Sequence, residues 1–159
     1  MSLASVKEFF AQHAPELEVL ELSVSTATVQ EAANAHGVAP GQIAKTISMR
    51  VGDRIIIIVT AGDQRLDNKK LKSFFGAKAS MLSMEEVVAE TGHPVGGVCP
   101  FGLLKPLEIF LDQSLKAWDV VLPAAGDIHA AVKITPALMA QLTNGQWVDF
   151  CRSPEGDAG

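Results

Sequence analysis

The amino-acid sequence predicts an α+β fold in which helices surround a mixed, largely antiparallel sheet that curls toward a barrel. The chain has 159 residues, which is the length of one ordinary domain. Several β-branched segments are joined by hairpin-like turns, and helical segments lie between only some of them, so the chain is not a strictly alternating βαβ protein. We expect one domain over residues 1–151 and a disordered tail over residues 152–159.

The N-terminal quarter predicts a helix, a strand and a second helix. Residues 5–13 carry apolar side chains at helical spacing, and residues 17–22 alternate apolar residues with acids, as a half-buried strand does. Thr28 and Glu31 have the spacing of a capping box, in which each side chain accepts a hydrogen bond from the other residue's backbone amide. They predict a short helix that ends at Gly37.

The middle of the chain predicts a β-hairpin. Residues 44–51 and 55–60 are both apolar and rich in β-branched side chains, and Gly52-Asp53 between them is a turn signal. The uninterrupted β-branched run 55–59 is typical of a strand that is buried on both faces.

The rest of the chain alternates helices, strands and turns. In order, we expect a helix over 67–75, a short strand over 79–82, a helix over 83–91 that a second capping box begins, strands over 107–111, 120–124 and 130–134, a helix from Thr135-Pro136 to Leu142, and a strand over 146–150. A long loop, residues 93–102, separates the two halves of this series.

Composition narrows the class of protein. The chain has two cysteines, too few for a disulfide framework or a zinc quartet, which fits a reducing compartment. The N-terminus lacks a basic segment followed by an apolar one, so no secretory signal is predicted. The longest apolar run, residues 55–61, is too short to span a bilayer. We expect a cytoplasmic protein that has no membrane contact.

Charge is unevenly distributed along the chain. Residues 45–78 carry eight Lys or Arg and three Asp, a net charge of +5, whereas the other residues carry five basic and fifteen acidic side chains, a net charge of −10. The basic stretch predicts either a surface that meets a polyanion or a solvated helix face with ordinary turn charges. The overall charge of −5 argues mildly against nucleic acid as a partner, and we expect no DNA binding.

The loop Val95-Gly96-Gly97-Val98-Cys99-Pro100-Phe101-Gly102 is the most informative stretch for chemistry. Adjacent glycines let backbone amides approach a ligand closely, and successive amides can hold an anion or a developing oxyanion. The alternative is a structural connection that needs its glycines for turns. The loop has neither the P-loop nor the dinucleotide-binding pattern.

Lys45 is the second candidate. It lies between apolar residues and alternates in phase with Ile43 and Ile47, so its charge would face an apolar surface. That placement is costly unless the side chain points into a cleft or finds a partner. The alternative is a charged residue that protects the edge of a sheet.

Cysteine and histidine chemistry is weakly indicated. Cys99 could act as a nucleophile if His93 or His129 were its base, but a small buried thiol is the simpler interpretation. His129 follows the turn Gly126-Asp127 and could project into a cleft or be structural. No His-x-x-His or Cys-x-x-Cys pair and no serine triad is present, so we expect neither a metal nor another cofactor.

Four segments in this order resemble the YbaK family, also called the prolyl-tRNA synthetase-associated editing domain. The resemblance extends from about Thr28 to Phe150. The segments are Gly-Val-Ala-Pro-Gly-Gln-Ile-Ala-Lys45-Thr46, Gly62-Asp-Gln-Arg-Leu-Asp-Asn-Lys-Lys-Leu71, Thr91-Gly-His-Pro-Val-Gly-Gly-Val-Cys-Pro-Phe-Gly102, and Ala124-Ala-Gly-Asp-Ile-His129-Ala with the following Thr135-Pro136.

The resemblance implies an activity. Members of the family hydrolyse the ester between a wrong amino acid and its tRNA, either as a domain inserted in prolyl-tRNA synthetase or as a free-standing protein, which the length of this chain favours. The implied partners are the acceptor end of a mischarged tRNA and, in addition, prolyl-tRNA synthetase. The basic stretch 45–78 would meet the acceptor stem.

The resemblance also assigns site residues. The lysine of the family corresponds to Lys45, and its glycine-to-proline loop corresponds to Gly96–Pro100. The implied catalytic residues are Lys45, Gly96, Gly97 and His129, and the implied substrate-binding residues are Thr46, Val98, Cys99, Pro100, Phe101 and Gly102.

Three matters stay open at this point. Thr46 is similar to the residue at this position in the branch of the family that removes cysteine, whereas Asp127-Ile128-His129 is unlike that branch. The expected substrate is therefore a Cys, Ala, Ser or Thr ester, and the expected tRNA is tRNA(Pro). A binding module that holds a nucleotide, tRNA or synthetase in the same pocket without turnover is the second hypothesis. An acyl-transfer enzyme that uses Cys99 is the third.

Overall fold

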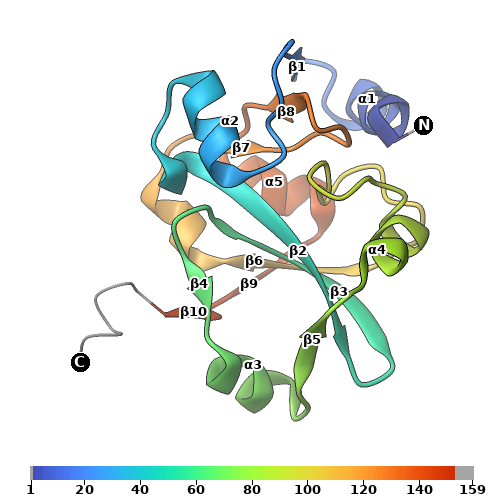
Figure 1. The fold of residues 1–159 in the computed structure, drawn as a ribbon, viewed down its shortest axis with the longest axis vertical. Coiled ribbons are helices and arrows are strands. Elements are labelled where there is room, and N and C mark those ends of the chain that lie inside the picture. The colour runs from blue at the N-terminus through green and yellow to red at the C-terminus, as the bar shows by residue number, and fades with distance from the viewer. Residues whose placement is uncertain (1, 153–159) are drawn as a thin grey trace.

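The computed structural model describes residues 2–152 and has a central mixed sheet with helices packed around it (Figure 1). The helices are α1 (Ser2–His13), α2 (Val29–His36), α3 (Asn68–Phe75), α4 (Met84–Thr91) and α5 (Pro136–Thr143), with the 3-10 turns η1 (Pro40–Gln42) and η2 (Gln113–Ala117). The strands are β1 (Val19–Glu21), β2 (Ile43–Val51), β3 (Arg54–Ala61), β4 (Arg65–Leu66), β5 (Ala79–Met81), β6 (Glu108–Asp112), β7 (Leu122–Pro123), β8 (Ala130–Val132), β9 (Gln146–Val148) and β10 (Cys151–Arg152).

The predicted hairpin forms the middle of the sheet. β2 and β3 pair antiparallel from Ala44 opposite Ala61 to Val51 opposite Arg54. Residues 56–59 of β3 have no solvent exposure, which confirms a strand buried on both faces. Successive side chains point to opposite faces of a sheet, so Ile57 and Val59 enter one apolar cluster while Ile56 and Ile58 enter another.

The sheet continues outward from this hairpin in the order β5-β2-β3-β6-β9. β5 is antiparallel to β2, whereas β6 is parallel to β3 and β9 is parallel to β6. The parallel pairs arise because long crossovers, one of which carries α3, β5 and α4, bring the chain back to the same edge. The sheet is therefore mixed, as expected, and its curl does not close into a barrel. Two further two-stranded pairings, β1 with β8 and β4 with β10, lie outside it.

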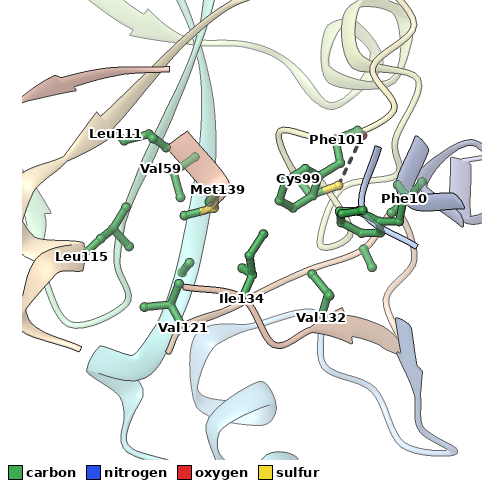
Figure 2. Packing of buried hydrophobic residues seen from close by; sticks show 14 of the residues in the cluster. Phe10, Val59, Cys99, Phe101, Leu111, Leu115, Val121, Val132, Ile134 and Met139 are labelled. Carbon is green, nitrogen blue, oxygen red and sulfur yellow. Dashed lines mark hydrogen bonds between the residues drawn. The ribbon is translucent and has the colours of Figure 1, made fainter. Parts of the chain in front are cut away.

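The larger apolar cluster attaches the glycine loop to the rest of the protein (Figure 2). Phe10 of α1 packs against Phe101 of the loop, with ring centroids 4.8 Å apart. Cys99 of the loop is buried in the same cluster as Val59 of β3 and Met139 of α5. The C-terminal part of the loop is therefore core rather than surface.

Local signals explain the helix boundaries. The side chains of Thr28 and Ser83 accept the amides of Glu31 and Glu86, and both predicted capping boxes are complete. Arg152, which the sequence places in the tail, belongs to β10 and lies opposite Arg65. Residues 153–159 of the expected tail are outside the described residues. Among residues 2–152, no helix has the length and apolar character that a membrane crossing requires.

Candidate functional site

A pocket of about 230 Å³ opens beside the N-terminal half of β2. Its walls come from the loop before α2 and from β2, β8 and α4, together with Gly96 and Val98 of the glycine loop. Much of the wall is made of small apolar side chains, which include Ala27, Ala44 and Ala131. The pocket therefore has room for a small, largely apolar group.

The edge of β2 is open along the pocket. On the side away from β3, β2 pairs with β7 at residues 43–44 and with β5 at residues 49–51. Residues 45–48 lie between these pairings and all four line the pocket. Alternate residues of an antiparallel strand direct their backbone N–H and C=O away from the partner strand, so two of these four present both groups at the open edge. A ligand can hydrogen bond there as an added strand segment would.

The hydroxyl of Thr46 is a polar group without a partner in this wall. Its Oγ1 is buried and makes no hydrogen bond within the described residues. A buried hydroxyl without a partner typically costs 1–3 kcal/mol, so proteins rarely keep one without a use. Thr46 is one of the residues that line the pocket, so a polar group bound there is a candidate partner for this hydroxyl.

Lys45, the neighbouring residue of β2, also lines the pocket. Its Nζ donates a hydrogen bond to the backbone oxygen of Gln64 in the turn after β3. Burial lowers the pKa of this lysine; the nearby Arg65 acts in the same direction, whereas Cys151 and Asp63 oppose the shift. Lys45 is the one residue with a titratable side chain among the described residues that line the pocket, and its ammonium lies at the turn after β3, near Asp63 and Arg65.

The two glycines of the loop have different roles. Gly96 lines the pocket at φ +90°, and an added Cβ would lie 2.8 Å from the Cβ of Ala27. Gly97 is buried against the turn at Asp127, where an added Cβ would lie 2.7 Å from a backbone nitrogen. The amide of Gly97 donates to Pro94 and its carbonyl accepts from Gly126. Gly97 therefore shapes the loop, and its amide already donates a hydrogen bond within the protein.

Cys99 belongs to the loop but does not line the pocket. Its thiol contacts the backbone oxygen of Phe101 at 3.5 Å and Nε2 of His93 at 3.7 Å. Burial raises the pKa of the Cys99 thiol to about 12, so the thiolate that a nucleophile requires is not formed near neutral pH. The interpretation as a small buried thiol fits this geometry better than the acyl-transfer hypothesis.

The structure separates other predicted site residues from the pocket. Phe101 is fully buried in the core, and Pro100 and Gly102 line a different hollow together with Phe9 and Leu104. None of the three lines the pocket at β2. Only the first half of the loop, Val95, Gly96 and Val98, lines the pocket at β2.

His129 is also outside the pocket wall. Its side chain is 43% exposed, and its Nδ1 lies 3.2 Å from Asp127, whose carboxylate also accepts the His129 backbone amide. This arrangement ties the imidazole to its own turn. The next two residues, Ala130 and Ala131, form the wall instead.

Several wall residues escaped the sequence analysis. Thr26, Ala27, Ser48 and Met81 line the pocket, as do the small residues of β8. The sequence carries one signal for this part of the wall, the paired alanines at 124–125 and 130–131, because larger side chains there would fill the pocket. Within residues 2–152, no three His, Cys, Asp or Glu side chains gather closely enough to hold a metal ion.

Comparison with known proteins identifies a family for this arrangement. The family model described as "Aminoacyl-tRNA editing domain" matches residues 24–142. "Uncharacterized protein YwhH" of Bacillus subtilis (strain 168) is 46% identical over 157 residues, which cover 98% of this chain and 100% of that protein. "Putative Cys-tRNA(Pro)/Cys-tRNA(Cys) deacylase EbsC" of Enterococcus faecalis (strain ATCC 700802 / V583) is 30% identical over 126 residues, 77% of this chain and 76% of that protein.

The solved structures agree. A structure titled "Crystal structure of a putative trans-editing enzyme for prolyl tRNA synthetase" superposes with a TM-score of 0.89 at 32% identity and covers 96% of this chain and 98% of that chain. The residues that the family model matches, 24–142, include every residue that lines the pocket.

Proposed function

Because this chain belongs to the aminoacyl-tRNA editing domain family, we propose that it is a trans-acting deacylase that hydrolyses the ester of a mischarged small amino acid on tRNA. The observation that carries the proposal is that Lys45, Gly96 and Thr46, whose hydroxyl has no partner in the described residues, all line one small pocket. Its alanine-lined walls suit a Cys, Ala, Ser or Thr side chain, with tRNA(Pro) as the expected carrier.

The proposed chemistry needs no protein nucleophile. An aminoacyl ester is already activated, so placing it correctly and stabilising the tetrahedral oxyanion supply most of the catalysis. The oxygen of a water bonds to the carbonyl carbon, the bond from that carbon to the ribose oxygen breaks, and the proton lost by the water ends on the ribose oxygen.

Named groups have distinct tasks in this scheme. The Lys45 ammonium holds the substrate carbonyl or the terminal phosphate. Because the Gly97 amide is bonded to Pro94, oxyanion donors have to come from the neighbouring Gly96 or Val98 backbone. One such donor is typically worth roughly 10²–10³ in rate. The open edge of β2 at residues 45–48 is placed to bind the amino acid's own polar groups.

The proposed partners follow from the substrate. The amino acid carried on the acceptor end of a mischarged tRNA enters the pocket, and prolyl-tRNA synthetase, whose product is edited, is the expected protein partner. A protein with this activity works in the cytoplasm, where tRNA is charged.

A non-catalytic binding module is the second candidate. It is favoured by one observation: apart from Lys45, the described pocket wall contains no acid, base or thiol. Such a module would bind a nucleotide, tRNA or the synthetase tightly and would release no amino acid.

The deciding experiment is deacylation of tRNA(Pro) charged in turn with proline, alanine, cysteine, serine or threonine, by wild type, by Lys45→Ala and by Lys7→Ala. Lys7 is an exposed lysine of α1 that pairs with Glu21, so its variant is the matched control. We expect release of one non-cognate amino acid by wild type and Lys7→Ala and none by Lys45→Ala. Binding without release from any of the five would favour the binding module, and full activity of Lys45→Ala would refute the site.

A further inference from the structure

Large apolar side chains are exposed beside the mouth of the pocket. Met81 is 68% exposed, Met84 71%, Val88 49% and Val95 46%. Met81 and Val95 also line the pocket, so they form both its wall and its rim. Met84 and Val88 are one turn apart on α4, and Val87 between them lines the pocket too. We call these four residues the apolar rim.

The apolar rim has the character of a contact surface. Contiguous exposed apolar side chains on a folded protein usually mark a binding site. The charges around it are acidic or already paired: Glu86 pairs with Arg50, Glu90 pairs with Lys105, and Glu85 is exposed. None of the four rim residues carries a charge, and Lys78, three residues before Met81, is the exposed cation nearest to them in the sequence. The rim therefore fits a flat, uncharged group.

The size of the pocket says where the rest of a substrate lies. A volume of about 230 Å³ is below the roughly 300–1,000 Å³ of pockets that enclose drug-sized ligands. The pocket can take a small amino acid but not an amino acid together with a nucleoside. Whatever is joined to the ester must lie outside, at the mouth.

We propose that the apolar rim, Met81, Met84, Val88 and Val95, binds the adenine base of the 3′-terminal nucleotide of the aminoacyl-tRNA. The inference rests on the proposed function, because the ester oxygen then belongs to the terminal ribose and the base is the next group along. Bases bind apolar and sulfur-containing side chains through their faces, and such contacts tolerate any sequence. Since the terminal nucleotide is adenosine in every tRNA, this contact is the same whichever tRNA arrives.

The test compares three esters of the same amino acid: aminoacyl-tRNA, 2′(3′)-O-aminoacyl-adenosine, and the 2′(3′)-O-aminoacyl ester of methyl riboside, which lacks the base. We expect wild type to have a kcat/KM for the adenosine ester roughly tenfold or more above that for the riboside ester. The double variant Met84→Ser, Val88→Ser should bring this ratio close to one. Leu104→Ser is the matched control, because Leu104 is 67% exposed but lines the separate hollow, and it should keep the wild-type ratio.

The outcomes separate the two proposals. Hydrolysis of none of the three esters would overturn the proposed function and this inference with it. Equal rates on the adenosine and riboside esters would overturn the inference alone and leave the deacylase standing. If the ratio were one and the double variant instead weakened binding to prolyl-tRNA synthetase, or dissociated an oligomer in sedimentation, the rim would be a protein interface and not a base site.

Discussion

Nε2 of His93 lies 2.7 Å from the backbone oxygen of Phe101, and both side chains are fully buried. A ring nitrogen this close to a carbonyl oxygen has to be the donor, so the proton is on Nε2. The bond joins the two ends of the segment that contains Gly96 and Val98. The other ring nitrogen of His93, Nδ1, is buried and has no hydrogen-bond partner within the described residues. His93 thus holds the loop in position from below and takes no part in the pocket wall.

Replacing His93 should change the acid stability of the protein. Burial lowers the pKa of His93, although the bond to Phe101 opposes the shift. In the unfolded chain His93 is protonated near pH 6.5, whereas in the folded protein it stays neutral to a lower pH. The free energy of unfolding therefore falls as the pH drops below 6.5. His36, whose pKa burial and Lys133 also lower, contributes in the same direction. When the pH is lowered from about 7.5 to 5.5, His93→Gln should lose less free energy of unfolding, measured in urea, than wild type does.

The matched variant for this measurement is His93→Leu. Gln can still donate to Phe101 whereas Leu cannot, so Leu should cost roughly 1–3 kcal/mol more at neutral pH. An acid dependence in His93→Gln equal to that of wild type would show that His93 is protonated with its ordinary pKa.

Removing the Cys99 thiol should leave catalysis roughly unchanged. The thiol is buried, its pKa is about 12, and it points into the core (Figure 2). Cys99→Ala should lower the free energy of unfolding by about 1 kcal/mol because it removes one small buried group. Loss of a true nucleophile would instead cost several orders of magnitude in kcat. Deacylation rates and urea unfolding of the same preparation distinguish these outcomes.

The fold was predictable where the signals are local. The turn Gly52-Asp53 between β-branched runs indicates the central hairpin, and the two capping boxes indicate where α2 and α4 begin. The parallel pairing of β3 with β6 has no such signal, because the pairing depends on how the crossover of residues 62–107 packs. Boundaries moved by a few residues where strands pair briefly, as at Leu122–Pro123.

The candidate site was predictable only in part. Lys45 was a candidate from its place in an apolar strand and Thr46 from the family resemblance, and both line the pocket with Gly96 and Val98. The motif does not say where the loop turns into the core, which is why Pro100, Phe101 and Gly102 lie elsewhere. His129 lies apart because Asp127, two residues earlier, accepts both its amide and its ring nitrogen.

Lys45→Met should abolish deacylation and increase stability. Because the folded-state pKa of Lys45 is lowered from 10.5, the folded protein holds the charged form at a cost that is fully present at neutral pH. That cost disappears as the pH rises past 10.5, the pKa of Lys45 in the unfolded chain. The gain in unfolding free energy of Lys45→Met over wild type should therefore shrink as the pH approaches 10.5. Chemical unfolding at several pH values measures it.

Lys70→Met is the control, because its stability should change in the opposite direction to that of Lys45→Met. The pKa of Lys70 is raised by the hydrogen bond to Asp149, so Lys70→Met should lose stability at neutral pH, and the loss should fade as pH rises through the folded-state pKa. If Lys45→Met were destabilised in the same way as Lys70→Met, the burial argument for Lys45 would be wrong.

Gly97→Ala should damage the loop. The new Cβ would lie 2.7–2.9 Å from backbone atoms of Asp127, which cannot move as a side chain can. We expect a loss of roughly 1–3 kcal/mol in unfolding free energy. Displacement of Gly96 and Val98 by about 1 Å should lower kcat by roughly 100-fold. Gly52→Ala is the control: its φ of +60° makes the variant strained, but it touches nothing within 4 Å, so stability should fall without loss of activity.

Thr46→Val should separate stability from activity at a single atom. The two side chains have nearly the same shape, and the hydroxyl that is removed has no partner in the protein. Removing an unpartnered buried hydroxyl relieves its desolvation, so Thr46→Val should gain roughly 1 kcal/mol in urea unfolding. If the hydroxyl bonds the substrate, kcat/KM should fall by roughly tenfold or more. The neighbouring Ser48 is also in the pocket wall, so Ser48→Ala shows whether any lost hydroxyl has this effect. A variant that is stabilised and keeps full activity would mean that the Thr46 hydroxyl meets no substrate atom.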